Sequence, residues 1–130
     1  MAKRKKTDLA ISFPQISLND AIVQGIMEKK GKEITILNLK NLHHAMFDSF
    51  VICHGTSSTQ VSAIADSVED EVYKLTGLTP AFKEGFTNAE WILLDYIDVV
   101  VHIFQENTRR FFHLENLWAD AEVKRIVDLD

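Results

Sequence analysis

The sequence has little cysteine, little proline and no long apolar run. Its single cysteine, Cys53, excludes an internal disulfide framework and fits a reducing compartment such as the cytoplasm. No apolar run approaches the roughly 18 residues that a membrane helix needs, and the N-terminus lacks the apolar core of a secretory signal. The 130 residues suffice for one domain with a real core and are too few for two.

Basic residues are unevenly distributed. Four of the 14 basic residues lie at positions 3–6, which leaves 10 basic against 19 acidic residues in the rest of the chain. An acidic body repels free nucleic acid and favours a basic protein surface as partner. We interpret residues 1–15 as a flexible basic tail and residues 16–130 as a single domain. The tail is either a solvated terminus or, if the partner is a ribonucleoprotein, a contact to its phosphates.

Apolar periodicity predicts a mixed α/β (α+β) fold. Ser17 is placed to cap a first helix that ends at Gly31, and Ser57 or Ser58 to cap a long helix that ends at Gly77. Strands are expected at 33–39, 49–54, 79–86, 91–95 and 98–104, the last two joined at Tyr96-Ile97. One or two short helices are expected within 107–127.

The residue pattern argues against an enzyme. Gly55-Thr56-Ser57-Ser58 could imitate the phosphate-binding turn of a nucleotidyltransferase, but no carboxylate pair one residue apart follows it. Asp95 and Asp98 are three residues apart across a turn, a spacing that does not predict a shared metal. The five histidines and Cys53 show no zinc-ligand spacing. We therefore expect no metal and no cofactor, with nucleotide binding or nucleotidyl transfer as the alternative.

What the sequence offers is an aromatic surface. Trp91, Tyr96 at the tip of a hairpin, and Phe111-Phe112 are large contact groups of the kind enriched at protein interfaces. Alternatives remain for several of them. Trp91 is a core or an interface residue, one of the two phenylalanines is expected in the core, and His102 is a hydrogen-bonded surface residue or an interface residue.

Several separated blocks resemble the ribosomal silencing factors, the Iojap-related proteins. Residues 48–61, DSFVICHGTSSTQV, are similar to the family's D-x-F-V-I-x-x-G-T-S-x-x-Q-V block. Glu84-Gly85 followed by Trp91 is similar to its E-G…W block, and the stretch from 90 to 120 resembles its hairpin and tail. These blocks lie in the right order across most of the chain, which makes the match far more specific than one short motif.

The resemblance implies a fold and a partner. The fold is a compact sheet flanked by helices, similar to the nucleotidyltransferase fold. The function is non-enzymatic: such proteins bind the large ribosomal subunit through ribosomal protein uL14 and sterically block the small subunit, which represses translation. An exposed hairpin would also allow a homodimer. Matching partner-binding positions here are Trp91, Asp95, Tyr96, Asp98 and His102, with Arg110 and Glu115 in the tail block.

One position departs from the family pattern. The family reads D-Y-G-D where this chain has Asp95-Tyr96-Ile97-Asp98. Glycine there would permit a positive φ in a tight turn, whereas a β-branched isoleucine should avoid it. Either the turn has another type in this chain or Ile97 is itself a contact.

Overall fold

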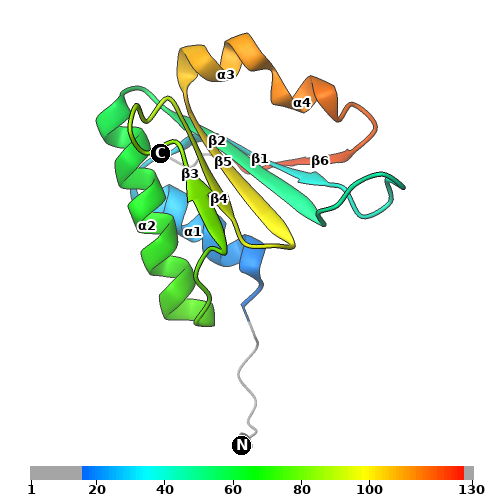
Figure 1. Cartoon of the computed structure of the whole chain (residues 1–130), viewed down its shortest axis with the longest axis horizontal. Coiled ribbons are helices and arrows are strands. Elements are labelled where there is room, and N and C mark those ends of the chain that lie inside the picture. Colours follow the sequence, from blue (N-terminus) through cyan, green and yellow to red (C-terminus); the bar gives the residue numbers. More distant parts are fainter. Residues whose placement is uncertain (1–15, 128–130) are drawn as a thin grey trace, which may run out of the picture.

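The computed structural model describes residues 16–127, which form a mixed six-stranded sheet with helices on both faces (Figure 1). The strand order is β3-β4-β5-β2-β1-β6, and β2 and β5 are parallel while the other neighbours are antiparallel. No helix within 16–127 is long and apolar enough to cross a bilayer. The elements are α1 (Leu18–Glu28), β1 (Lys32–Asn38), β2 (Ser49–Gly55), α2 (Ser58–Thr76), β3 (Phe82–Glu84), β4 (Trp91–Asp95), β5 (Val99–Gln105), α3 (Glu106–Phe112), α4 (Leu114–Leu117) and β6 (Glu122–Arg125).

Two apolar cores lie on opposite faces of the sheet. Helices α1 and α2 cover one face, and α3 with α4 lies over the other (Figure 1). Because successive side chains of a strand point to opposite faces, β2 supplies Val51 and Cys53 to the first core and Phe50 and Ile52 to the second. The central strands β2 and β5 are buried on both sides, as the near-continuous apolar runs predict. Cys53 is fully buried, as expected from its place in β2.

The predicted helix starts are confirmed. The Ser17 Oγ accepts from the Asp20 N–H at 3.1 Å, and the Ser57 Oγ accepts from the Gln60 N–H at 3.1 Å. Gly77 ends α2 with a φ of +77°, a conformation that glycine adopts without strain. The expected end of the first helix was wrong: α1 ends at Glu28, and its C-cap is Lys29 rather than Gly31.

Strands differ from expectation at the sheet edges. The expected strand 79–86 is reduced to β3, because Pro80 and the positive φ of Gly85 interrupt the pairing. Strand β6 was not expected at all, since its four residues are exposed and three of them are charged. Edge strands commonly carry such charges, which discourage further pairing. The predicted tail 1–15 lies outside the described residues.

The contact between α1 and α2 depends on Gly25. A Cβ built on Gly25 would lie 2.7 Å from the Cα of Val68, and the Ser67 Oγ donates to the Gly25 carbonyl at 2.7 Å. The helices therefore pack backbone to backbone at this point.

We expect Gly25→Ala to lower the free energy of unfolding by about 1–3 kcal/mol, because the new methyl group must push the helices apart. Urea denaturation measures this, with Gln24→Ala on the exposed face of the same helix as the control. Alanine improves helix propensity at either position, so equal stabilisation of both variants would refute the close contact.

Candidate functional site

The hairpin of β4 and β5 sets the positions of the aromatic surface residues. Its register pairs Trp91 with Phe104 and Leu93 with His102, so Trp91 and His102 are diagonal neighbours on one face. The Trp91 Nε1–H donates to the His102 Nδ1 at 3.1 Å. The indole is half-buried, with its ring centroid 4.7 Å from that of Phe104. Trp91 is therefore both a core and a surface residue.

The sequence left open that His102 is a hydrogen-bonded surface residue, and the structure shows that it does not face solvent. Its side chain is buried on the face that carries the second core, where Phe50 packs edge-on with the ring centroids 4.6 Å apart. Since Nδ1 accepts from Trp91, the ring proton lies on Nε2, which is buried with no hydrogen-bond partner in the structure. Burial lowers the pKa of His102 to about 4. The hydrogen bond that its Nδ1 accepts holds the Trp91 indole in one orientation.

Phe112 and Phe111 extend the surface beyond Trp91. The Phe112 ring lies 5.0 Å from Trp91 and 5.1 Å from Phe111, measured between centroids. The expectation that one of the two phenylalanines is in the core was wrong: Phe111 is 80% exposed and Phe112 is 48% exposed. Helix α3 is short: it ends at Phe112, and the C-cap residue His113 has a positive φ. Trp91, Phe111 and Phe112 form what we call the aromatic patch.

The hairpin tip is a γ-turn centred on Ile97. The Tyr96 carbonyl accepts from the Asp98 N–H at 3.0 Å, and Ile97 has a φ of +78°. This positive-φ form is rare and strained. The Asp95 carboxylate accepts from the Ile97 N–H at 2.7 Å and holds the turn. The expectation that isoleucine avoids positive φ here was therefore wrong, because the carboxylate and the strand pairing impose the turn that glycine would make.

Tyr96 is not an exposed group at the tip. Its side chain is 6% exposed and packs in the core beneath α1 and α2, and burial raises the pKa of its hydroxyl. Asp98, by contrast, is exposed at the tip. Tyr96 therefore supports the hairpin from inside, and the residues exposed at the tip are Ile97 and Asp98, with Asp95 partly exposed beside them.

Arg109 is the central polar residue of the tail, and the sequence did not single it out over Arg110. It is only 3% exposed, and its guanidinium donates to Glu115 at 2.7 Å and to the His54 Nδ1 at 3.0 Å. It also donates to the Thr35 Oγ1 at 3.2 Å and the Lys32 carbonyl at 3.4 Å. These contacts tie α3 and α4 to β1 and β2. Burial opposes ionisation of Glu115, but the hydrogen bonds from Arg109 prevail and lower its pKa.

Arg110 lies outside this network. Its guanidinium donates to Glu33 at 2.8 Å and to Glu106 at 3.2 Å, and its side chain is half exposed. The Arg110 hydrogen bond lowers the pKa of Glu33. The predicted partner-binding residues Arg110 and Glu115 therefore lie close together in the sequence but belong to two different ion pairs.

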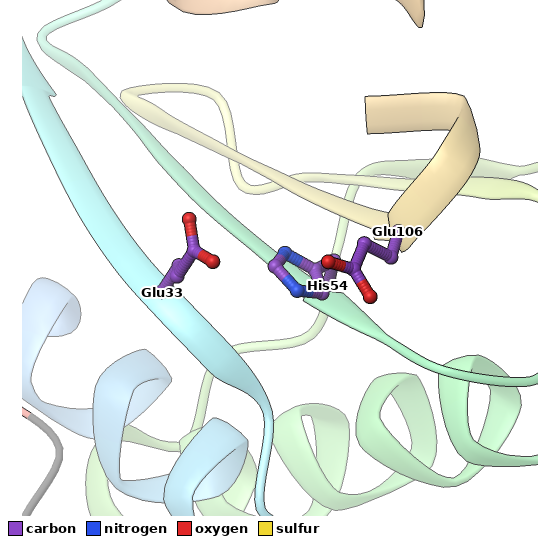
Figure 2. Close-up of side chains that lie close together, drawn as sticks. All are labelled: Glu33, His54 and Glu106. Atoms are coloured by element: carbon purple, nitrogen blue, oxygen red, sulfur yellow. The ribbon is translucent and has the colours of Figure 1, made fainter. Parts of the chain in front are cut away.

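Within residues 16–127, Glu33, His54 and Glu106 form a group that could hold a metal ion. One ligand atom from each lies within 4.8 Å of the others, and Figure 2 shows the His54 ring between the two carboxylates. Arg110 already bridges both carboxylates with a positive charge. Arg109 donates to the His54 Nδ1 and so fixes the ring proton on Nε2, whereas a metal-bound histidine donates from its other nitrogen. The cluster is better described as an ion-pair network than as a metal site.

A cavity of about 690 Å³ opens beside this network. It lies where the parallel strands β2 and β5 end, and its lining includes His54, Thr56 and Glu106. Ligands commonly bind at the carboxyl ends of parallel strands, so its location is that of a ligand pocket. The cavity is separate from the aromatic patch.

The family is shown by comparison with known proteins. The family model described as "Ribosomal silencing factor during starvation" matches residues 13–130. The chain belongs to this family. The ribosomal silencing factor RsfS of Halalkalibacterium halodurans is 39% identical over 99 residues, which cover 76% of this chain and 83% of the relative. RsfS of Bacillus subtilis is 39% identical over 103 residues, 79% of this chain and 83% of the relative.

Solved structures agree with this RsfS-family assignment. A crystal structure of a protein from Chromobacterium violaceum has a TM-score of 0.73 at 30% identity, with 85% of this chain and 91% of that chain covered. A crystal structure from Bacillus halodurans has a TM-score of 0.67 at 38% identity, with 78% and 92% covered. The chloroplastic protein Iojap of Zea mays is 31% identical over 108 residues, 82% of this chain and 45% of that protein. The mixed sheet flanked by helices is thus the fold of this family.

Proposed function

We propose that this protein binds the large ribosomal subunit through ribosomal protein uL14 and sterically blocks the small subunit, which represses translation in the cytoplasm. Membership of the ribosomal silencing factor family supports ribosome association. No chemical step is required. Mass action sets the fraction of large subunits that carry the protein, and the bound protein sterically excludes the small subunit from the same surface. The described domain with the tail before it would act as one binding unit.

The location proposed for the interface rests on the partial exposure of Trp91. Its indole is fixed by the hydrogen bond to His102 and by contact with Phe112, so little side-chain entropy is lost when a partner covers it. Tryptophan in such a position is typical of an interface hot spot. Asp95 and Asp98 lie on the same hairpin, and their charge suits a basic ribosomal protein.

The other predicted residues divide into contacts and supports. Trp91, Asp95 and Asp98 would touch the partner. Tyr96 and His102 would hold the hairpin from inside, since both are buried. Arg110 of α3 is half exposed and could touch the partner, whereas Glu115 of α4 supports Arg109.

Two further contacts are proposed beyond the aromatic patch. The basic tail at residues 3–6 would reach ribosomal RNA phosphate, which would make part of the affinity salt-dependent. In the absence of ribosomes, the aromatic patch would allow a homodimer that hides the same residues. Concentration-dependent sedimentation of the wild type and of a patch variant would distinguish this dimer from a monomer.

We expect Trp91→Ala to lose at least about tenfold in affinity for the large subunit, because truncation removes the fixed indole at the centre of the patch. Co-sedimentation of the purified protein with separated large and small subunits measures this. The matched control is Tyr73→Ala, an aromatic residue that is 61% exposed on α2 and away from the hairpin. It should bind as the wild type does.

The same experiment separates the proposal from its alternative. Binding to the large subunit alone, lost in Trp91→Ala and kept in Tyr73→Ala, supports a silencing factor that uses the hairpin. If both variants bound the large subunit as the wild type does, the interface would have to lie on another surface of the protein. A rise in melting temperature with Mg-ATP, without binding to either subunit, would favour a nucleotide-binding protein that uses the cavity beside His54.

A further inference from the structure

Ile97 occupies a backbone conformation that suits glycine. Its φ is +78°, and its N–H and the flanking carbonyl are held by the Asp95 carboxylate and the Asp98 N–H. A β-branched side chain is strongly disfavoured at positive φ. Strained backbone of this kind persists where surrounding structure imposes it, and it concentrates at binding sites. The tip would be more stable with glycine in place of isoleucine.

The Ile97 side chain is not packed in the apolar cores of the described residues, so core packing does not offset the strain. It is 66% exposed, and neither apolar core formed by residues 16–127 includes it. Its neighbours on the surface are acidic: Asp98 is exposed and Asp95 is partly exposed. An apolar side chain is thus presented between two carboxylates, on a turn that it destabilises.

We propose that Ile97 is a specificity-determining contact, inserted into an apolar socket rimmed by basic residues on the protein partner. The acidic flanks favour a basic rim, and the exposed aliphatic group favours a socket that removes it from water. Ile97 lies six positions after Trp91, two residues beyond the end of β4, so an extended chain spans at most about 20 Å between them. A single interface of standard size covers that span, so the aromatic patch and the tip can meet one partner.

This inference rests on the proposed function for the identity of the partner, and three variants test it. Ile97→Gly removes the side chain and the strain. Ile97→Ala removes most of the side chain but keeps a Cβ at positive φ. Ile97→Leu keeps an apolar group of the same size. Melting temperature and affinity for the large subunit are measured for each variant and for the wild type.

We expect Ile97→Gly to melt a few degrees above the wild type and to bind the large subunit about tenfold more weakly. Ile97→Ala should bind as weakly without the gain in melting temperature, and Ile97→Leu should bind within about threefold of the wild type.

Wild-type affinity in both Ile97→Gly and Ile97→Ala would overturn the inference and leave the proposed function standing. Weak binding of Ile97→Gly alone would also overturn it, since that result assigns the effect to backbone freedom rather than to the side chain. No binding of the wild-type protein would overturn the inference together with the proposed function.

Discussion

Arg109→Met should lower the free energy of unfolding by about 2–4 kcal/mol, because it removes the buried member of an ion pair whose other member, Glu115, is 27% exposed. Methionine keeps the length of the side chain but cannot make the hydrogen bonds that Arg109 donates to the His54 Nδ1, the Thr35 Oγ1 and the Lys32 carbonyl. Each such group loses a hydrogen bond, and the side chains of His54 and Thr35 are buried. Urea denaturation at neutral pH measures the loss.

Arg110→Met is the matched control for this prediction. The two arginines are adjacent in sequence, but Arg110 is half exposed, and its pairs with Glu33 and Glu106 lie in solvent. Exposed pairs of this kind contribute little, so the variant should be close to the wild type in stability. Similar losses in the two variants would show that burial of Arg109 does not determine its contribution.

The Arg109 network also connects stability to the proposed interface. Arg109 and Glu115 fix α3 and α4 against the sheet, and Phe112 at the end of α3 packs on Trp91. Loss of the network should therefore loosen Phe112 before it unfolds the sheet. The large-subunit affinity of Arg109→Met, measured where the variant is still folded, should fall together with its stability.

The sequence predicted the central elements because each has a strong local signal. Ser17 and Ser57 cap helices with their own side chains, and the apolar run of β2 has the composition of a buried strand. The hairpin followed from two apolar runs around a short polar break. These features depend on neighbouring residues, which a single sequence displays directly.

The features that the sequence could not supply depend on contacts between distant residues. Strand β6 has no apolar period, and it pairs only because β1 offers an edge. Arg109 and Arg110 are chemically identical, and only the orientation of α3 buries one of them. The Trp91–His102 pair could have been found: once the two-residue loop is placed at Ile97-Asp98, rather than at Tyr96-Ile97, the hairpin register pairs Leu93 with His102 and makes Trp91 its diagonal neighbour.

Placement of the candidate site shows the same division. The acidic and aromatic character of the hairpin was readable, since it depends on composition. Burial of Tyr96 was missed because the residue was assigned to the exposed turn, whereas strand alternation continues through it and puts its ring on the core face with Ile92 and Leu94. The strain at Ile97 required the observed φ, since the sequence left two explanations for the missing glycine.

Acidification should destabilise the protein between pH 6.5 and pH 4, with a loss of about 2–3 kcal/mol at pH 4.5 relative to pH 7 from His102 alone. Burial holds the pKa of His102 near 4 in the folded state, below its ordinary value of 6.5. In this range the unfolded chain binds a proton that the folded chain does not, so stability is present above pH 6.5 and falls as the pH is lowered. The pKa of His54, lowered by burial and by Arg109, acts in the same direction.

His102→Gln tests the assignment, because glutamine can still accept from the Trp91 N–H but carries no proton-binding ring. Urea denaturation at pH 7 and pH 4.5 gives the change in unfolding free energy for each protein. The variant should lose less stability than the wild type on acidification, whatever its stability at pH 7. His43→Gln removes an exposed histidine as the control. An unchanged pH dependence in His102→Gln would show that the buried ring does not govern the acid response, and the fixed orientation of Trp91 would then need another cause.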